Sequence, residues 1–312
     1  MNSPLISVII PCYNHGQYID DAVKSVKEYK NDNYEIVIIN DGSTDEWTNK
    51  RLLELKNEGY NVIFQENQGL SKTRNNGIRI ARGKYILPLD ADNKIKPEYI
   101  IRAIEILDKN SEFSVVYGDA ELFGDREGRK SIGAFDIKRL LNVNFIDACA
   151  VFRKSAWERC GGYNSNMIYG WEDWDFWLNL FEMHFKFYYI PEVVFLYRFR
   201  ENSMMRLMDH EKQKYLRNII FLNHLKLYAK YHFIPKGIYK LEIKITIKVW
   251  FWYFLYNPPI NKRNSALLYS LIKIAIRQKI AKKHPEISIN NPLWNSFKYI
   301  LKKKLRCHNY ES

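Results

Sequence analysis

The sequence lacks the features that mark several other protein classes. Its four cysteines show no Cys-x-x-Cys or Cys-x-x-His spacing, which argues against a zinc site and against a disulfide framework. No stretch reaches the roughly 18 consecutive apolar residues of a membrane-spanning helix. The N-terminal apolar run is too short for a signal peptide and has no basic residues before it. We therefore expect a protein of a reducing compartment, the cytoplasm.

Acidic residues are scarce in the last third of the chain. Residues 1–204 hold 26 Lys+Arg and 30 Asp+Glu, whereas residues 205–312 hold 22 and 5. The whole excess of +13 at pH 7 therefore lies after residue 204. This shift in composition predicts two domains, 1–204 and 205–312.

Short β-branched runs alternate with amphipathic stretches over the first 120 residues. Strands that are apolar on both faces and separated by helices predict an α/β fold, with a mostly parallel sheet covered on both sides. No Gly-x-Gly-x-x-Gly follows the first strand, which argues against a dinucleotide-dependent dehydrogenase. The predicted strands are 5–11, 35–40, 61–65, 84–89 and 113–118, and the predicted helices are 17–30, 46–58, 70–81 and 97–109.

Two carboxylates, Asp90 and Asp92, follow an apolar strand, and no basic residue comes before Lys94. Close carboxylates repel each other, so this arrangement needs compensation; a simple turn is the ordinary alternative. Ligands of parallel sheets bind beyond the carboxyl ends of the strands, where this pair lies. Mg²⁺ and Mn²⁺ are typically held by one or two carboxylates plus substrate phosphates. We therefore predict a Mn²⁺ or Mg²⁺ phosphate site at this pair.

Other acidic residues stand at positions that suit either structure or chemistry. Asp41 follows the second predicted strand, so its carboxylate could accept a hydrogen bond from a nucleobase at the ligand edge. Glu172 and Asp173 follow a glycine, as in the first turn of a helix. Helical spacing there places Trp171 and Trp174 on one face, as in a protein core.

Four stretches together resemble the inverting family-2 glycosyltransferases of GT-A fold, over about residues 5–204. The resemblance implies transfer of a sugar from a nucleotide-diphosphate donor, expected to be UDP-linked, to a glycan or lipid-linked acceptor of surface polysaccharide synthesis. The stretches occur in this order: SVIIPCYNHGQYIDDAVKSV, EIVIINDGSTD, ENQGLSKTRNNGIRIARGKYILPLDADN and GWEDWDFWLNL.

The same resemblance implies a role for each matching residue. Asp173 would be the general base that deprotonates the acceptor hydroxyl, with Glu172 as the second candidate and Asp175 as the third. For Arg74, a solvated helix face is the alternative to a place near the nucleotide. The implied donor-binding residues are Pro11, Tyr13, Asn14, Asp41, Arg74 and Asp90, and the implied metal ligands are Asp90 and Asp92.

One departure from the family pattern concerns the metal site. The family often carries Y-R-x-H-x-x-S after its last catalytic-domain strand, and the histidine can complete the metal site. This chain reads YRFRENS over 197–203, with Arg200 in the place of the histidine. Arginine stays protonated and cannot ligate a metal, but it could pair with the donor diphosphate through two hydrogen bonds.

The basic last third mixes lysine with aromatic residues. Lys240, Lys244 and Lys248 recur at four-residue spacing beside apolar positions, which predicts a basic amphipathic helix. Such helices bind anionic membrane surfaces, so we expect a peripheral protein at the inner face of the cell membrane. A helical packing appendage is the alternative. No nucleic-acid partner is expected, because no reader motif appears.

Two other functions stay open at this point. One is a noncatalytic glycan- or membrane-binding module on a transferase-like fold, against which the donor, metal and acceptor motifs all argue. The other is a metal-dependent phosphohydrolase that uses Asp90 and Asp92. No histidine-rich second metal shell lies near this pair in the sequence, which argues against the hydrolase.

Overall fold

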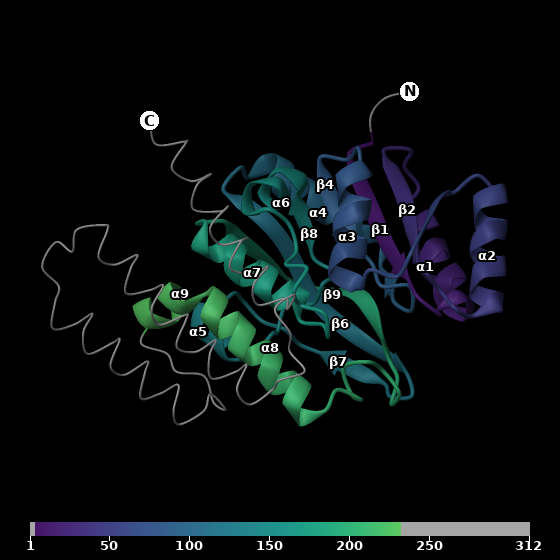
Figure 1. Ribbon diagram of the computed structural model, residues 1–312. Coiled ribbons are helices and arrows are strands. Elements are labelled where there is room, and N and C mark those ends of the chain that lie inside the picture. The colour runs from purple at the N-terminus through teal and green to yellow at the C-terminus, as the bar shows by residue number, and fades with distance from the viewer. Residues whose placement is uncertain (1–3, 232–312) are drawn as a thin grey trace, which may run out of the picture. The chain divides into compact units, whose positions relative to one another are not determined.

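The computed structural model describes residues 4–231 of the chain (Figure 1). One compact unit ends at Lys212, and residues 213–231 belong to a second unit. The predicted domain boundary at residue 204 stays a prediction, and the predicted basic helix with Lys240 lies outside the described residues. Within 4–231, every helix is too short or too polar to span a bilayer.

The described residues form one sheet of nine strands. Eight of them follow the order β3-β2-β1-β4-β8-β6-β9-β5, and β7 pairs with β6 beside this path. The strands are β1 (Ile6–Cys12), β2 (Tyr34–Asp41), β3 (Asn61–Gln65), β4 (Tyr85–Pro88), β5 (Lys94–Ile95), β6 (Phe113–Gly124), β7 (Gly128–Lys130), β8 (Val151–Arg153) and β9 (Lys186–Phe199).

The sheet has a parallel half and a mixed half. Strand β1 pairs in parallel with β2 and β4, and β2 pairs in parallel with β3. Strand β8 runs antiparallel to both β4 and β6, and β5 runs antiparallel to β9. The predicted α/β fold with a mostly parallel sheet is confirmed, and the parallel half supplies the edge at which the loops after β1, β2 and β4 gather.

Helices cover both faces of the sheet. Helices α1, α2 and α4 share one buried cluster with alternate residues of the strands, such as Val8 and Ile10. The intervening Ile9 faces α3 on the opposite side, because successive strand residues point to opposite faces. The helices are α1 (Gly16–Lys27), α2 (Glu46–Asn57), α3 (Leu70–Ile80), α4 (Pro97–Lys109), α5 (Ile137–Asn142), α6 (Lys154–Cys160), α7 (Glu172–Glu182), α8 (His210–Asn223) and α9 (Leu225–Lys230).

A glycine sets the position of α3 on the sheet. A Cβ atom at Gly77 would lie 2.6 Å from Ile9 Cγ2 and 2.6 Å from Ile39 Cδ1, too close for any real side chain. Gly77 therefore lets α3 pack tightly onto β1 and β2. This close packing fixes the height of Arg74, one turn earlier on the same helix.

The predicted elements agree with the structure except at some ends. The first helix stops at Lys27 rather than residue 30, where Tyr29 folds back so that its N–H donates to the Val26 carbonyl. The predicted strand 113–118 continues to Gly124, because β9 pairs with it along its whole length. Long pairing partners of this kind lie too far apart in sequence to be read from a local pattern.

Candidate active site

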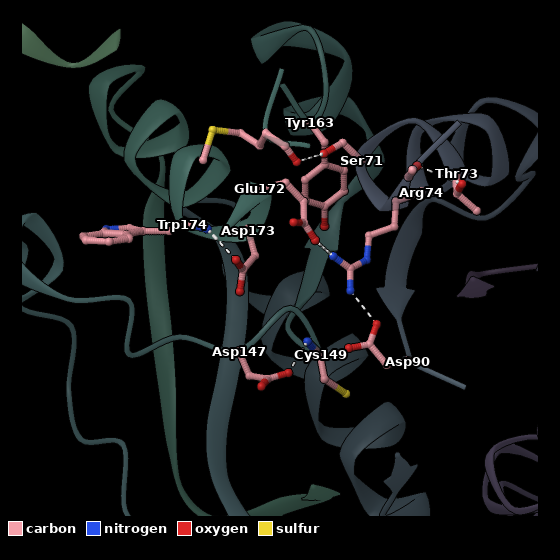
Figure 2. Close-up of polar contacts among 12 residues, drawn as sticks. Ser71, Thr73, Arg74, Asp90, Asp147, Cys149, Tyr163, Glu172, Asp173 and Trp174 are labelled. Carbon is pink, nitrogen blue, oxygen red and sulfur yellow. Dashed lines mark hydrogen bonds and ion pairs between the residues drawn. The ribbon is translucent and has the colours of Figure 1, made fainter. Parts of the chain in front are cut away.

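Arg74 on α3 lies at the centre of the polar edge. Its guanidinium is 1% exposed and binds two carboxylates, Glu172 through Nη1 and Asp90 through Nη2 (Figure 2). Asp90 follows β4, whereas Glu172 opens α7, so one buried cation joins two parts of the chain. The alternative of a solvated helix face for Arg74 is therefore wrong.

Burial and charge oppose each other in this cluster. Burial favours the neutral form of Arg74, but the carboxylates of Asp90 and Glu172 outweigh it and raise the pKa of the guanidinium. Burial raises the pKa of Glu172, and Arg74 counters this in part. Among the described residues, Arg74 Nε and Glu172 Oε2 are buried without a hydrogen-bond partner. The cluster is thus compensated in charge but incompletely hydrogen-bonded.

A second arginine compensates Asp92. Arg200 donates a hydrogen bond from Nε to Asp92 Oδ2 at 3.0 Å, and its Nη2 forms an ion pair with the same oxygen at 2.7 Å. Its Nη2 also lies 3.0 Å from His15 Nε2, which accepts because a guanidinium can only donate. Burial lowers the pKa of His15, which favours the neutral ring that this contact requires. The negative charge of Asp90 and Asp92 is therefore compensated by two arginines from distant segments, Arg74 and Arg200.

The turn after β4 receives the end of β9, which places Arg200. The Arg198 backbone N–H donates to Asn93 Oδ1 at 2.9 Å, and Arg198 Nε donates to the Asp92 carbonyl at 3.0 Å. Arg198 also binds Asp21 on α1 at 2.8 Å. The two contacts with Asn93 and with the Asp92 carbonyl hold β9 in register against the turn, so the side chain two residues later meets the Asp92 carboxylate.

The carboxylate pair still has capacity for a divalent cation. Arg74 binds Asp90 Oδ1, and Arg200 binds Asp92 Oδ2. Within the described residues, the other oxygen of each carboxylate, Asp90 Oδ2 and Asp92 Oδ1, has no hydrogen-bond partner. No group of three or more His, Cys, Asp and Glu side chains in 4–231 is arranged to hold a metal. The residues thus fit a cation that takes its remaining ligands from substrate oxygens and water.

Asp173 lies in the first turn of α7, beside the Arg74 cluster (Figure 2). Its Oδ2 accepts a hydrogen bond from Asn144 Nδ2 at 2.7 Å, and its Oδ1 accepts one from the Trp174 backbone N–H at 2.9 Å. Burial, and next the charge of Glu172, raise the pKa of Asp173 to about 7. A carboxyl group with this pKa can take up a proton near neutral pH.

Trp171 departs from its expected place. Its φ of 58° is left-handed, so it is the N-cap of α7 rather than part of the helix, although its ring still packs edge-on against that of Trp174, with centroids 5.4 Å apart. Trp174 instead is buried, and its indole N–H donates to the Leu140 carbonyl at 2.6 Å. The sharp turn at Gly170 and Trp171 directs the first turn of α7 toward Arg74.

Asp41 and Asn14 organise the loops of the donor side. Asp41 is 4% exposed and accepts hydrogen bonds from the Gln68 and Gly69 backbone N–H groups and from the Gln65 amide. Asn14 accepts from the backbone N–H groups of residues 44 and 45, which joins the loop after β1 to the loop after β2. Pro11 lies in β1 and is buried, whereas Tyr13, just after the strand, is 44% exposed.

Three site residues were not predicted from the sequence. His15 stands in the loop after β1 and Asn144 in the segment before β8, where no periodic pattern marks them. Asp147, in the same segment, accepts the Cys149 backbone N–H at 3.0 Å, and burial raises its pKa (Figure 2). The signal that the sequence offered for His15 was its place in the polar loop that follows the first strand.

Comparisons with known proteins agree with this architecture. EpsH of Bacillus subtilis, which carries a glycosyltransferase designation, is 40% identical over 101 residues, 32% of this chain and 29% of EpsH. An uncharacterized glycosyltransferase of Haemophilus influenzae is 27% identical over 237 residues, 70% of this chain and 72% of that protein. The crystal structure of Staphylococcus aureus TarS 1–349 in complex with UDP-GlcNAc has a TM-score of 0.53 at 18% identity, covering 72% of each chain.

The family is shown by the sequence itself. The profile of glycosyl transferase family 2 matches residues 7–161, which contain β2 to β4, all but the first residue of β1, Arg74 and the Asp90–Asp92 pair. TarS supports the fold of the same region. Residues 7–161 of the chain therefore belong to glycosyl transferase family 2, and the described part of the chain has the GT-A fold.

Proposed function

We propose that this protein transfers a sugar from a nucleotide-diphosphate donor, a UDP-sugar, to a glycan or lipid-linked glycan, with inversion, in surface polysaccharide synthesis. One observation carries the proposal: Arg74 joins Asp90 on the donor side to Glu172, and the adjacent Asp173 has a pKa of about 7. The UDP-GlcNAc complex of TarS, a protein of the same fold, supports a UDP-linked donor.

The donor would lie along the carboxyl edge of the parallel strands. Pro11, Tyr13, Asn14 and Asp41 would surround the base and ribose, and Asp90 would lie near the ribose. Asp41 holds the loop that follows β3 through two backbone N–H groups, which would shape the wall of the nucleoside site. The exposed ring of Tyr13 offers a stacking surface for the base.

The acceptor would react beside α7. Its hydroxyl proton passes to an Asp173 carboxylate oxygen as the hydroxyl oxygen bonds to the anomeric carbon. The bond from that carbon to the diphosphate breaks on the opposite side, and its electron pair leaves with the nucleoside diphosphate. Glu172, bound to Arg74, is held away from this role. A single displacement of this kind inverts the anomeric centre.

Asp90 and Asp92 would hold Mn²⁺ or Mg²⁺ through the oxygens that the arginines leave free. When bound, the metal would offset the negative charge that grows on the departing diphosphate. Arg200 would approach the same diphosphate from the position next to Asp92, and its guanidinium would exchange part of its contact with Asp92 and His15 for hydrogen bonds to phosphate oxygens.

This role of Arg200 predicts opposite effects for two substitutions. Arg200→His is expected to strengthen Mn²⁺ binding, because it frees Asp92 Oδ2 and adds a nitrogen ligand. Arg200→Ala is expected to weaken donor binding at fixed metal concentration, because a diphosphate contact is lost. Calorimetric titrations of both variants with Mn²⁺ and with UDP measure the two affinities.

A matched control separates this effect from a general loss of positive charge. Arg126→Ala removes an exposed arginine from the turn between β6 and β7 and should leave both affinities at the wild-type values. Unchanged Mn²⁺ and donor affinities in both Arg200 variants would mean that Arg200 has no part in the donor site.

The proposed function is tested by a screen of nucleotide sugars. Each is added with Mn²⁺, and thermal stabilisation and release of nucleoside diphosphate are both recorded. Stabilisation and slow release with a UDP-sugar are expected. Binding without release for every donor would favour a noncatalytic module, and release of inorganic phosphate from simple phosphate esters would favour a phosphohydrolase. Binding of the basic residues 205–312 to an anionic membrane surface stays a prediction.

A further inference from the structure

Asn144 contacts the carboxyl group of Asp173 from a segment remote in sequence. Its Nδ2 donates to Asp173 Oδ2 at 2.7 Å, across a separation of 29 residues. The side-chain carbonyl Oδ1 of Asn144 is buried and has no hydrogen-bond partner among the described residues. One end of this amide is thus committed to Asp173, and the other end is unused.

The segment that carries Asn144 is clamped by α7 itself. The Trp174 indole donates to the Leu140 carbonyl at 2.6 Å, and the Trp177 indole donates to the Ile146 carbonyl at 3.1 Å. Both indoles belong to α7, which carries Asp173 in its first turn. The two carbonyls, of Leu140 and Ile146, lie on either side of Asn144 in the sequence. The amide is therefore held in register with the first turn of α7.

The charges around Asp173 do not supply this contact. Glu172 on the same helix and Asp147 from the segment before β8 both disfavour the ionised carboxylate. Arg74 from α3 favours it, but its two Nη atoms are bound to Asp90 and Glu172. Asn144 is the neutral side chain that donates directly to a carboxylate oxygen of Asp173.

We propose that Asn144 is a positioning residue that supports Asp173 in both of its protonation states; this rests on the proposed role of Asp173 as the base. Before transfer, Nδ2 donates to the carboxylate. After the acceptor proton arrives on Asp173, a half-turn of the amide lets Oδ1 accept the new O–H, because the two ends of an asparagine amide differ only in being donor or acceptor. The unused carbonyl then gains its partner.

The first test measures stability and needs no activity. Asp173 has a folded pKa above its unfolded value, so its contribution favours folding when it is protonated and is lost as pH rises through about 7. Asn144→Ala removes a strong hydrogen bond to the ionised form and a weaker one to the protonated form, because bonds to a charged group are about twice as strong. The difference should raise the folded pKa by about one unit. The unfolding equilibrium constant of Asn144→Ala, divided by that of the wild type, should therefore be at least about tenfold larger at pH 9.5 than at pH 5. Urea unfolding at the two pH values measures this ratio.

The same comparison in an Asp173→Asn background isolates the contact. There the cost of Asn144→Ala should not depend on pH, because residue 173 no longer ionises. A pH-dependent cost that persists in this background, or a cost without pH dependence beside Asp173, would overturn the proposal. If Asn144→Ala does not fold, Asn144→Ser is measured under the same criteria.

The second test uses the enzyme with a donor from the screen. The acid limb of kcat/KM should move to higher pH by about one unit in Asn144→Ala, with activity recovering at high pH. Asn142→Ala, an exposed neighbour at the end of α5, should keep the wild-type profile. A uniform loss at every pH with an unmoved limb would indicate a structural role only. A wild-type protein that uses no donor would refute the proposed function, whereas the stability test would still decide the contact.

Discussion

Asp173→Asn is expected to lower the rate of sugar transfer by about 10²–10⁴-fold, the usual loss when a general base is removed. Asparagine is close in size to aspartate but cannot take the acceptor proton. Donor binding should survive, because the donor-side carboxylate Asp90 and the acceptor-side Glu172 bind different nitrogen atoms of Arg74. Single-turnover rates and UDP-sugar affinity, measured on the same preparation, give the two values.

Stability provides the control for this variant. The raised pKa of Asp173 means that ionisation destabilises the fold, with the loss growing as pH rises from the unfolded pKa to about 7. Asparagine does not ionise, so at pH 8 Asp173→Asn should unfold at or above the wild-type temperature. Collapse of donor affinity together with the rate would instead make Asp173 a donor or structural residue.

Asp92→Asn is expected to reduce transfer to background, a loss of at least about 10²-fold, as when one transition-state electrostatic contact is removed. The variant weakens the metal site and leaves Arg200 without its carboxylate partner. Metal-dependent UDP affinity should fall as well, whereas the fold should persist because Asp92 lies in a turn outside the core. Calorimetric titration of UDP with and without Mn²⁺ measures the first effect.

Asp21→Asn is the matched control for Asp92→Asn. Asp21 also accepts a hydrogen bond from an arginine near the end of β9, at 2.8 Å from Arg198, but it lies on α1 and belongs to neither substrate side. The turnover of Asp21→Asn should match that of the wild type. Wild-type turnover in Asp92→Asn, at saturating donor and metal, would remove Asp92 from the mechanism.

The parallel half of the fold was predictable because its signals are local. Each strand of that half is an apolar run followed by its own helix, so β1 to β4 and α1 to α4 could be placed from short windows of sequence. The polar ends of those runs then indicated Asp41, Asp90 and Asp92 as residues of one edge. The short strands β7 and β8 gave no such signal, because each has only three residues.

The compensation of the carboxylates could not be predicted in the same way. Arg74 and Glu172 are separated by 98 residues, and Arg200 and Asp92 by 108. The sequence showed two close carboxylates without a nearby base, and a metal was the simplest answer. The structure adds two arginines that act before any metal binds, and these follow from tertiary packing of α3, α7 and β9.

The direct displacement at the centre of this account is tested by the anomeric configuration of the first product. An α-linked UDP-sugar that the protein hydrolyses slowly is followed by proton NMR in the first minutes, before the free sugar mutarotates. Attack opposite the leaving diphosphate, with Asp173 taking the proton, predicts that the β-sugar appears first. Initial release of the α-sugar would contradict a single displacement and with it the assigned role of Asp173.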